Sequence, residues 1–174
     1  MADTLLRISV VLWVATFAVG AVDGLYYHLI KLRLHQRAGS RTEHVAHSLR
    51  ALLLPLTLWA AFVATDLAPA ARLGLLLALI AADLGVAVWD VILESKSRRA
   101  LGGLPHVEYF VHVAATAAHS AAEAFVVAAV VLTLRGGAGS APAVVVGLAW
   151  ILIVGSTLVG AVHVLALARP QTER

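Results

Sequence analysis

Residues 142–168 read PAVVVGLAWILIVGSTLVGAVHVLALA, a run that contains no Asp, Glu, Lys or Arg. About 20 apolar residues in a helix are enough to cross the hydrocarbon core of a bilayer. Inside hydrocarbon every backbone N–H and C=O must be bonded within the protein, and for a single run of this length only a helix achieves that. The stretch therefore predicts a transmembrane helix.

Four similar runs precede it, so that the expected spans cover 5–30, 48–66, 71–93, 106–134 and 142–168. The chain of 174 residues is 61% hydrophobic and 13% charged, which is more apolar surface than one soluble core of this size can bury. Glycine and proline mark the breaks between runs. We expect an all-α, integral membrane helical bundle of five transmembrane helices that forms a single domain over 1–174.

Lys and Arg are distributed unevenly between the two sets of loops. One side has Lys31, Arg33, Arg37, Arg41, Lys96, Arg98, Arg99, Arg169 and Arg174, whereas the other has only Arg72 and Arg135. By the positive-inside rule the first side is cytoplasmic, so the N-terminus is outside and the C-terminus inside, as in a bacterial inner membrane. The net charge of +3 reflects this bias, which indicates membrane lipids and no nucleic acid as partners. The chain has no cysteine, which excludes thiolate metal sites.

All eight histidines fall in the cytoplasmic half of this topology. They are His28, His35, His44, His47, His106, His112, His119 and His163. The pair at 44 and 47 shares one helix face, and the pair at 28 and 35 lies two turns apart. Two stripes at helical spacing accompany them, namely Glu108, His112, His119 and Glu123 on one helix and Asp83, Asp90 and Glu94 on another. Several helices are thus expected to direct imidazole and carboxylate groups toward one place.

Several of these residues also have simpler interpretations. Ser40-Arg41-Thr42-Glu43 has the form of a capping box, which favours a helix cap for Glu43. His35 and His106 lie at the polar boundary, where solvation is an equal alternative. For Asp83 and Glu123 the alternative interpretation is a protonated side chain that packs between helices. So many polar rings in a bilayer nevertheless need a compensating partner, and a bound metal is the natural one.

Imidazole and carboxylate ligands without sulfur favour iron, and eight histidines exceed the needs of one tetrahedral zinc. We therefore expect two metal ions, with iron favoured. The expected ligands are His28, His44, His47, His112, His119 and His163, with Asp90 or Glu94 as a carboxylate ligand, Asp23 as an acceptor behind an imidazole, and His35, His106 and Glu108 as further candidates.

Histidines spaced as His44-x2-His47 and His28-x6-His35 at the cytoplasmic ends of helices, with more on a later helix pair, resemble the membrane-bound histidine-rich diiron hydroxylases and desaturases. The resemblance is one of pattern and topology over 28–119, and this chain is shorter and lacks the adjacent double histidine of that family. It implies dioxygen activation at two irons, a lipid-like substrate and an external electron donor.

Further roles follow for residues near the expected metals. Tyr26, Tyr27 and Tyr109 are close enough in sequence to hydrogen-bond an oxygen ligand, and Glu123 would supply protons along its stripe. The apolar interior would admit a lipid-like substrate from the side.

Three alternative functions stay open. A b-type haem protein would use a pair such as His119 with His163 as axial ligands. A zinc-dependent hydrolase would use Glu43 or Glu108 as general base, although Glu43-His44-x2-His47 is not the H-E-x-x-H motif. A metal or proton carrier would need polar residues that continue to the opposite face of the membrane. Only Asp66 and Asp83 contribute to such a path.

Overall fold

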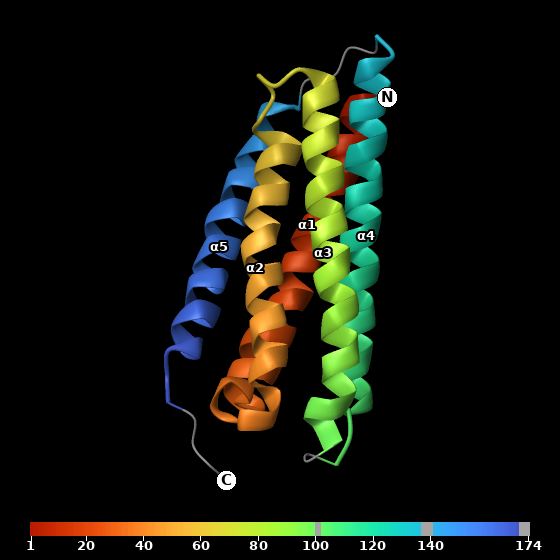
Figure 1. The fold of residues 1–174 in the computed structure, drawn as a ribbon. Coiled ribbons are helices and arrows are strands. Elements are labelled where there is room, and N and C mark those ends of the chain that lie inside the picture. Colours follow the sequence, from red (N-terminus) through yellow and green to blue (C-terminus); the bar gives the residue numbers. More distant parts are fainter. Residues whose placement is uncertain (100–101, 137–140, 171–174) are drawn as a thin grey trace.

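The computed structural model describes residues 1–99, 102–136 and 141–170, and 87% of it is helix. The prediction of an all-α fold is confirmed, since five helices are long and apolar enough to cross a membrane (Figure 1). They are α1 (Ala2–Ala21) with its continuation η1 (Val22–Lys31), α2 (Arg41–Phe62), α3 (Pro69–Arg98), α4 (His106–Leu134) and α5 (Ala143–Leu167). Two short 3-10 turns, η2 (Leu34–Gln36) and η3 (Ala38–Ser40), join η1 to α2.

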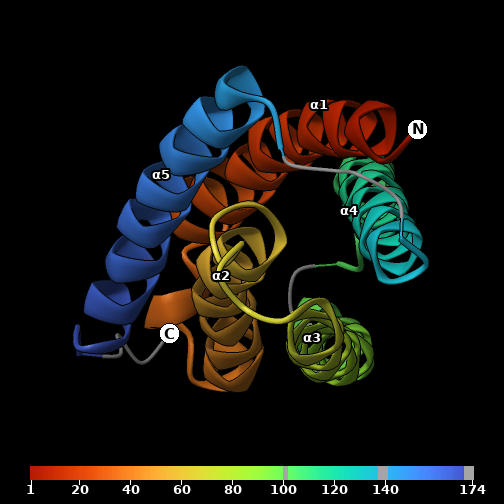
Figure 2. The ribbon, with the colours of Figure 1, turned by 90° about the horizontal axis from the view of Figure 1, so that it is seen from above.

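The helices form a ring rather than a simple up-and-down series. Helix α1 packs on α4, α4 on α3, α3 on α2, α2 on α5, and α5 on α1. The view from above shows α5 along one side of the bundle, where it packs on α2 and on α1 (Figure 2). Side chains from all five helices can therefore reach the interior of the bundle.

Apolar side chains fill the half of the ring that contains the N-terminus. The buried set there includes Trp13, Leu58, Phe62, Leu76, Val126 and Leu152. Buried backbone groups at the end of α2 are satisfied from α3, because the Arg72 guanidinium donates to the carbonyls of Ala60 and Ala61. This half is a conventional apolar core, and its described residues form no cluster of potential metal ligands.

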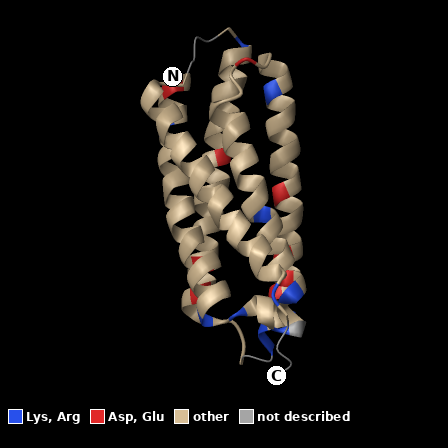
Figure 3. Cartoon of the chain, turned by 90° about the vertical axis from the view of Figure 1, so that its left-hand side faces the viewer, with Lys and Arg blue, Asp and Glu red and all other residues tan. Residues whose placement is uncertain are grey.

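Most of the lysines and arginines gather at the other end, where the C-terminus also lies (Figure 3). The connection between η1 and α2 and the connection between α3 and α4 both lie at this end, which we call the basic end (Figure 1). The sequence-based spans differ most from the structure here. Helix α2 begins at Arg41 rather than near 48, and α3 continues to Arg98, so that residues expected in loops are helical.

The first span also departs from a uniform α-helix. From Val22 onward its backbone is π-helical and ends at Lys31, and Arg33 then adopts a left-handed conformation with φ of 51°. His35 consequently belongs to the separate turn η2, so the expectation that it lies two turns after His28 on one helix is wrong. The π-helical segment has a direct effect on the site that it borders.

Candidate metal centre

Four helices direct acidic and imidazole side chains into the bundle near the basic end. This set, the polar cluster, comprises Asp23, His28, Glu43, His47, Asp90, Glu94, Glu108 and His112, all of them buried. Every one of the four helices contributes at least one carboxylate. A buried set of this kind in an otherwise apolar bundle is unusual, because each group loses its hydration.

Helical spacing explains how each helix presents its pair. On α2 and α4 the order is a glutamate followed four residues later by a histidine, which places Glu43 beside His47 and Glu108 beside His112. On α3 the same four-residue spacing separates two carboxylates, Asp90 and Glu94. On the first helix Asp23 and His28 are five residues apart, a separation that an α-helix would turn onto different faces.

The π-helical segment corrects that mismatch. Its hydrogen bonds span five residues, so side chains five apart come together. His28 Nε2 accordingly lies 3.6 Å from Asp23 Oδ1. Single π-helical turns within α-helices are frequent at functional sites, and here the irregularity completes the fourth side of the polar cluster.

Three imidazoles form the centre of the polar cluster. The ring of His47 packs edge-on against that of His28, with centroids 3.9 Å apart, and His112 lies 5.7 Å from His47 and 6.3 Å from His28. A carboxylate lies between each pair of rings. The three resulting groups are Asp23 with His28 and His112, Glu43 with His28 and His47, and Asp90 with His47 and His112, and within each the potential ligand atoms lie within 4.8 Å of one another.

Arg98 is the one buried Lys or Arg that the described part of the chain places in this region. Its Nη1 donates to Glu43 Oε2 at 2.9 Å, its Nε donates to Glu108 Oε1 at 3.1 Å, and it is 1% exposed. Sequence reasoning counted Arg98 among the loop charges and missed this role. The capping-box interpretation of residues 40–43 is wrong. Glu43 bonds to Arg98, and Ser40 makes no side-chain cap bond, since its hydroxyl accepts from Ser97 instead.

Many polar atoms of the cluster have no hydrogen-bond partner among the described residues. They include Asp23 Oδ1, His28 Nδ1, Glu43 Oε1, His47 Nε2, both carboxylate oxygens of Asp90, Glu94 Oε1, Glu108 Oε2 and His112 Nδ1. Buried polar atoms are ordinarily paired, and each orphan requires a physical explanation. Oxygen and nitrogen lone pairs that converge from four helices fit a bound metal ion.

A second polar group lies farther from the basic end. His119 Nε2 is 3.1 Å from Glu123 Oε1 and 3.4 Å from Asp83 Oδ2, and the same aspartate pairs with Arg50, whose Nε is 3.3 Å from Asp83 Oδ1. We call this the Arg50 group. The guanidinium already supplies a positive charge, so this group has less need of a metal than the polar cluster has.

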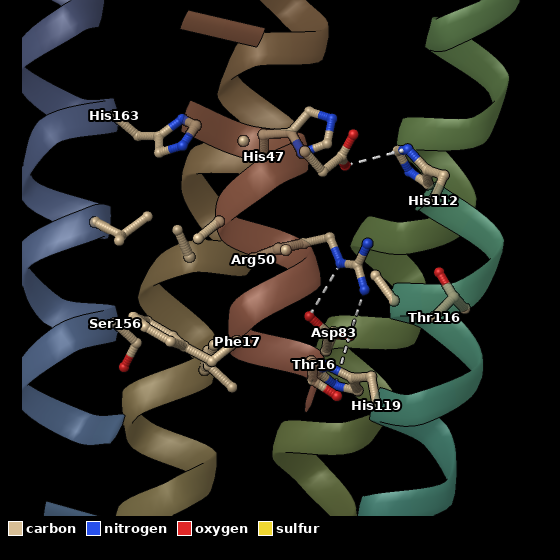
Figure 4. A pocket seen from close by; sticks show the side chains of 18 residues that line it. Thr16, Phe17, His47, Arg50, Asp83, His112, Thr116, His119, Ser156 and His163 are labelled. Carbon is tan, nitrogen blue, oxygen red and sulfur yellow. Dashed lines mark hydrogen bonds and ion pairs between the residues drawn. The ribbon is translucent and has the colours of Figure 1, made fainter. Parts of the chain in front are cut away.

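A cavity of about 120 Å³ joins the two polar groups. Figure 4 shows His163, His47 and His112 around one end of it and Arg50, Asp83 and His119 around the other. Thr16, Thr116 and Ser156 add hydroxyl groups to its lining. Polar walls and this volume suit several water molecules.

The remaining predicted ligands do not join the polar cluster. His44 Nε2 lies 3.1 Å from the carbonyl oxygen of His163, and the two rings stack with centroids 5.1 Å apart. The ring of His35 lies 5.7 Å from that of His44, and it is buried, so the solvated interpretation of His35 is wrong. We call His35, His44 and His163 the histidine row.

Two of the predicted residues lie on the outer surface, and the tyrosines divide between surface and interior. His106 is exposed at the first position of α4, and Tyr109 is 58% exposed. Tyr26 is half exposed, whereas Tyr27 is buried with its ring beneath the Lys31 ammonium. The structure therefore does not bring His106 or Tyr109 to the polar cluster.

The geometry of His119 and His163 does not fit axial ligation of a haem. The His163 ring is stacked on His44, and the His119 ring packs edge-on against Trp13 with centroids 4.7 Å apart.

Comparison of the chain with protein families, with curated proteins and with solved structures finds no match in any of the three.

Proposed function

We propose that this chain is a membrane-embedded metalloprotein that holds two divalent metal ions, with iron favoured, in the polar cluster. It would act as an oxidase, hydroxylase or desaturase on a lipid-like substrate. The observation that carries the proposal is the set of unpaired carboxylate and imidazole atoms that converge from four helices. Helical bundles that bind two metal ions use this donor set, with carboxylates on all four helices and histidines beside some of them.

Charge supports two ions rather than one. The five carboxylates of the polar cluster face the single guanidinium of Arg98, which leaves four negative charges when the histidines are neutral. Two divalent cations would neutralise that excess. Without them the charge would have to be offset by protons on the carboxylates or on the three histidines, or be left uncompensated in a medium of low polarity, which is costly.

Bound iron would supply the redox chemistry, in which one oxygen atom enters a C–H bond, the other leaves as water, and an external donor provides the electrons. The chain's own residues hold the ions, exclude bulk water and deliver protons. Oxygens of Asp23 and Asp90 lie 3.3–3.6 Å from ring nitrogens of His28, His47 and His112, so these carboxylates would hold the ions together with the three rings. The basic end would face the cytoplasm, as the distribution of Lys and Arg favours.

A zinc-dependent hydrolase is the second candidate. The observation that favours it is the triangle of His28, His47 and His112, since three imidazoles and a water make a common catalytic zinc site. Charge argues against it, because a single zinc would leave part of the negative excess of the polar cluster in place.

The Arg50 group gives a prediction about proton delivery. Replacing Glu123 with glutamine should slow oxygen consumption of the iron-loaded protein about tenfold or more and leave metal content unchanged. The reason is that Glu123 bonds to His119, which lines the cavity leading to the polar cluster, and does not itself belong to that cluster. Oxygen uptake with a chemical reductant and metal analysis of the same sample would measure both quantities.

Asp66→Asn is the matched control for this experiment, since Asp66 is an exposed acid between α2 and α3. Wild-type oxygen uptake by the Glu123→Gln protein would contradict the proton-delivery role. A metal-dependent hydrolysis with no metal-dependent oxygen uptake in the wild type would instead favour the zinc alternative.

A further inference from the structure

The histidine row lies beside the polar cluster but has a different chemical character. All three of its imidazoles are buried, and within the described residues no ion pair joins any of them to a carboxylate. His35 lies in the turn at the basic end, His44 on α2 and His163 on α5. The rings follow one another at centroid distances of 5.7 and 5.1 Å.

The hydrogen bond of His44 determines which of its nitrogens can bind a cation. A carbonyl oxygen only accepts, so the contact between His44 Nε2 and the His163 carbonyl requires the proton on Nε2. In the neutral ring Nδ1 then carries the lone pair, and this buried atom has no hydrogen-bond partner among residues 1–99, 102–136 and 141–170. A histidine whose other nitrogen donates to a backbone carbonyl is the usual arrangement for a metal ligand.

The other two rings also have free nitrogens. Both ring nitrogens of His35 and Nδ1 of His163 are buried, and none of them has a hydrogen-bond partner within the part of the chain that the structure describes. Neither nitrogen of the His35 ring is engaged by a carboxylate among the described residues, so the ring can offer a lone pair. A site made of neutral donors beside arginines gives a divalent ion coordination but no charge compensation, and its affinity should be low.

The inner end of the row opens toward the proposed metal site. His163 lines the cavity together with His47 and His112 (Figure 4). The absence of a side chain at Gly24 allows this approach, because a Cβ there would lie 2.9 Å from His163 Nε2. The row therefore extends from the turn at the basic end to the wall of the cavity.

We infer that the histidine row is an entry path along which divalent metal ions pass from the basic end to the polar cluster. The inference rests on the proposed metal-binding function. Weak neutral donors hold an ion briefly at each step, and the four negative charges of the polar cluster draw it inward. Proton conduction fits the row less well, because the His163 carbonyl holds the Nε2 proton of His44 in place.

The test compares the rate of metal uptake with the final amount bound. Metal-free protein is mixed with cobalt(II), which is redox-stable in air and coloured when bound by nitrogen and oxygen ligands, and absorbance is followed by stopped flow. His44→Gln keeps an amide N–H for the His163 carbonyl but removes the ring lone pair. The His44→Gln protein should bind cobalt at least about tenfold more slowly than the wild type. Its final cobalt content and final spectrum should be the same as those of the wild type.

His35→Gln provides a second variant, since it removes the ring lone pairs while keeping most of the volume of this buried side chain, and slower cobalt uptake is expected there too. His106→Ala, an exposed histidine at the same end, is the control and should fill at the wild-type rate. Wild-type filling rates in both row variants would overturn the inference and leave the metal site standing. A lower final cobalt content in His44→Gln would overturn it in favour of a resident ligand. Failure of the wild type to bind cobalt would overturn the metal site and the entry path together.

Discussion

Replacing Arg98 with methionine is expected to lower the free energy of unfolding of the metal-free protein by about 3–5 kcal/mol. The guanidinium is almost fully buried and bonds to Glu43 and Glu108, which come from two other helices. Its loss leaves two carboxylates without a counter-charge in the interior. Removing one partner of a buried ion pair is among the most damaging single changes for that reason.

Arg99→Met is a closely matched control, because Arg99 is the next residue and is exposed. Both variants remove one positive charge from the basic end, so a difference between them isolates the buried contacts. The difference in stability would be measured by thermal unfolding in detergent, with the loss of the helical signal as the readout. Equal melting temperatures for the two variants would mean that the Arg98 contacts contribute little to stability.

Replacing His47 or His112 with alanine is expected to remove metal from the protein and most of the stability that metal provides. At a metal concentration about a thousand times the dissociation constant, the wild type should gain about 4 kcal/mol. Each of these rings belongs to two of the three groups of potential ligands, so its loss weakens both groups at once. Metal analysis and melting with and without metal would measure the effect.

His106→Ala serves as the control for these variants, since His106 lies on the same helix as His112 but is exposed. His35 is unsuitable for that purpose because it is buried in the histidine row. Metal content in His47→Ala and His112→Ala equal to that of the wild type would refute the ligand assignment.

The fold could be predicted from the sequence because its determinants are local. Apolar runs of bilayer length specify helices, and the four-residue spacing from Glu108 to His112 places both on one face whatever the neighbours are. The clustering of histidine and carboxylate near the basic end was predicted for the same reason. Asp90 and Glu94 lie within that cluster, as their stripe indicated.

The details that sequence reasoning missed depend on irregular backbone or on distant partners. Asp23 was expected as an acceptor behind an imidazole, but helical periodicity alone does not pair it with His28, because that pairing depends on the π-helical segment between them. Arg98 looked like a loop charge, since its partners Glu43 and Glu108 belong to other helices. One signal was available, namely that two glutamates at the basic end of an apolar bundle need a cation. His44 and His163 pair with each other instead of joining the cluster, because α5 packs on α2 where the two rings meet.

Metal analysis with an absorption spectrum, on protein purified from its native membranes, tests the central claim most directly. The account predicts two irons per chain and a spectrum without the intense band of haem, because four helices supply donors and charge for two divalent ions. Stoichiometric zinc, a haem spectrum or the absence of stoichiometric metal would contradict it.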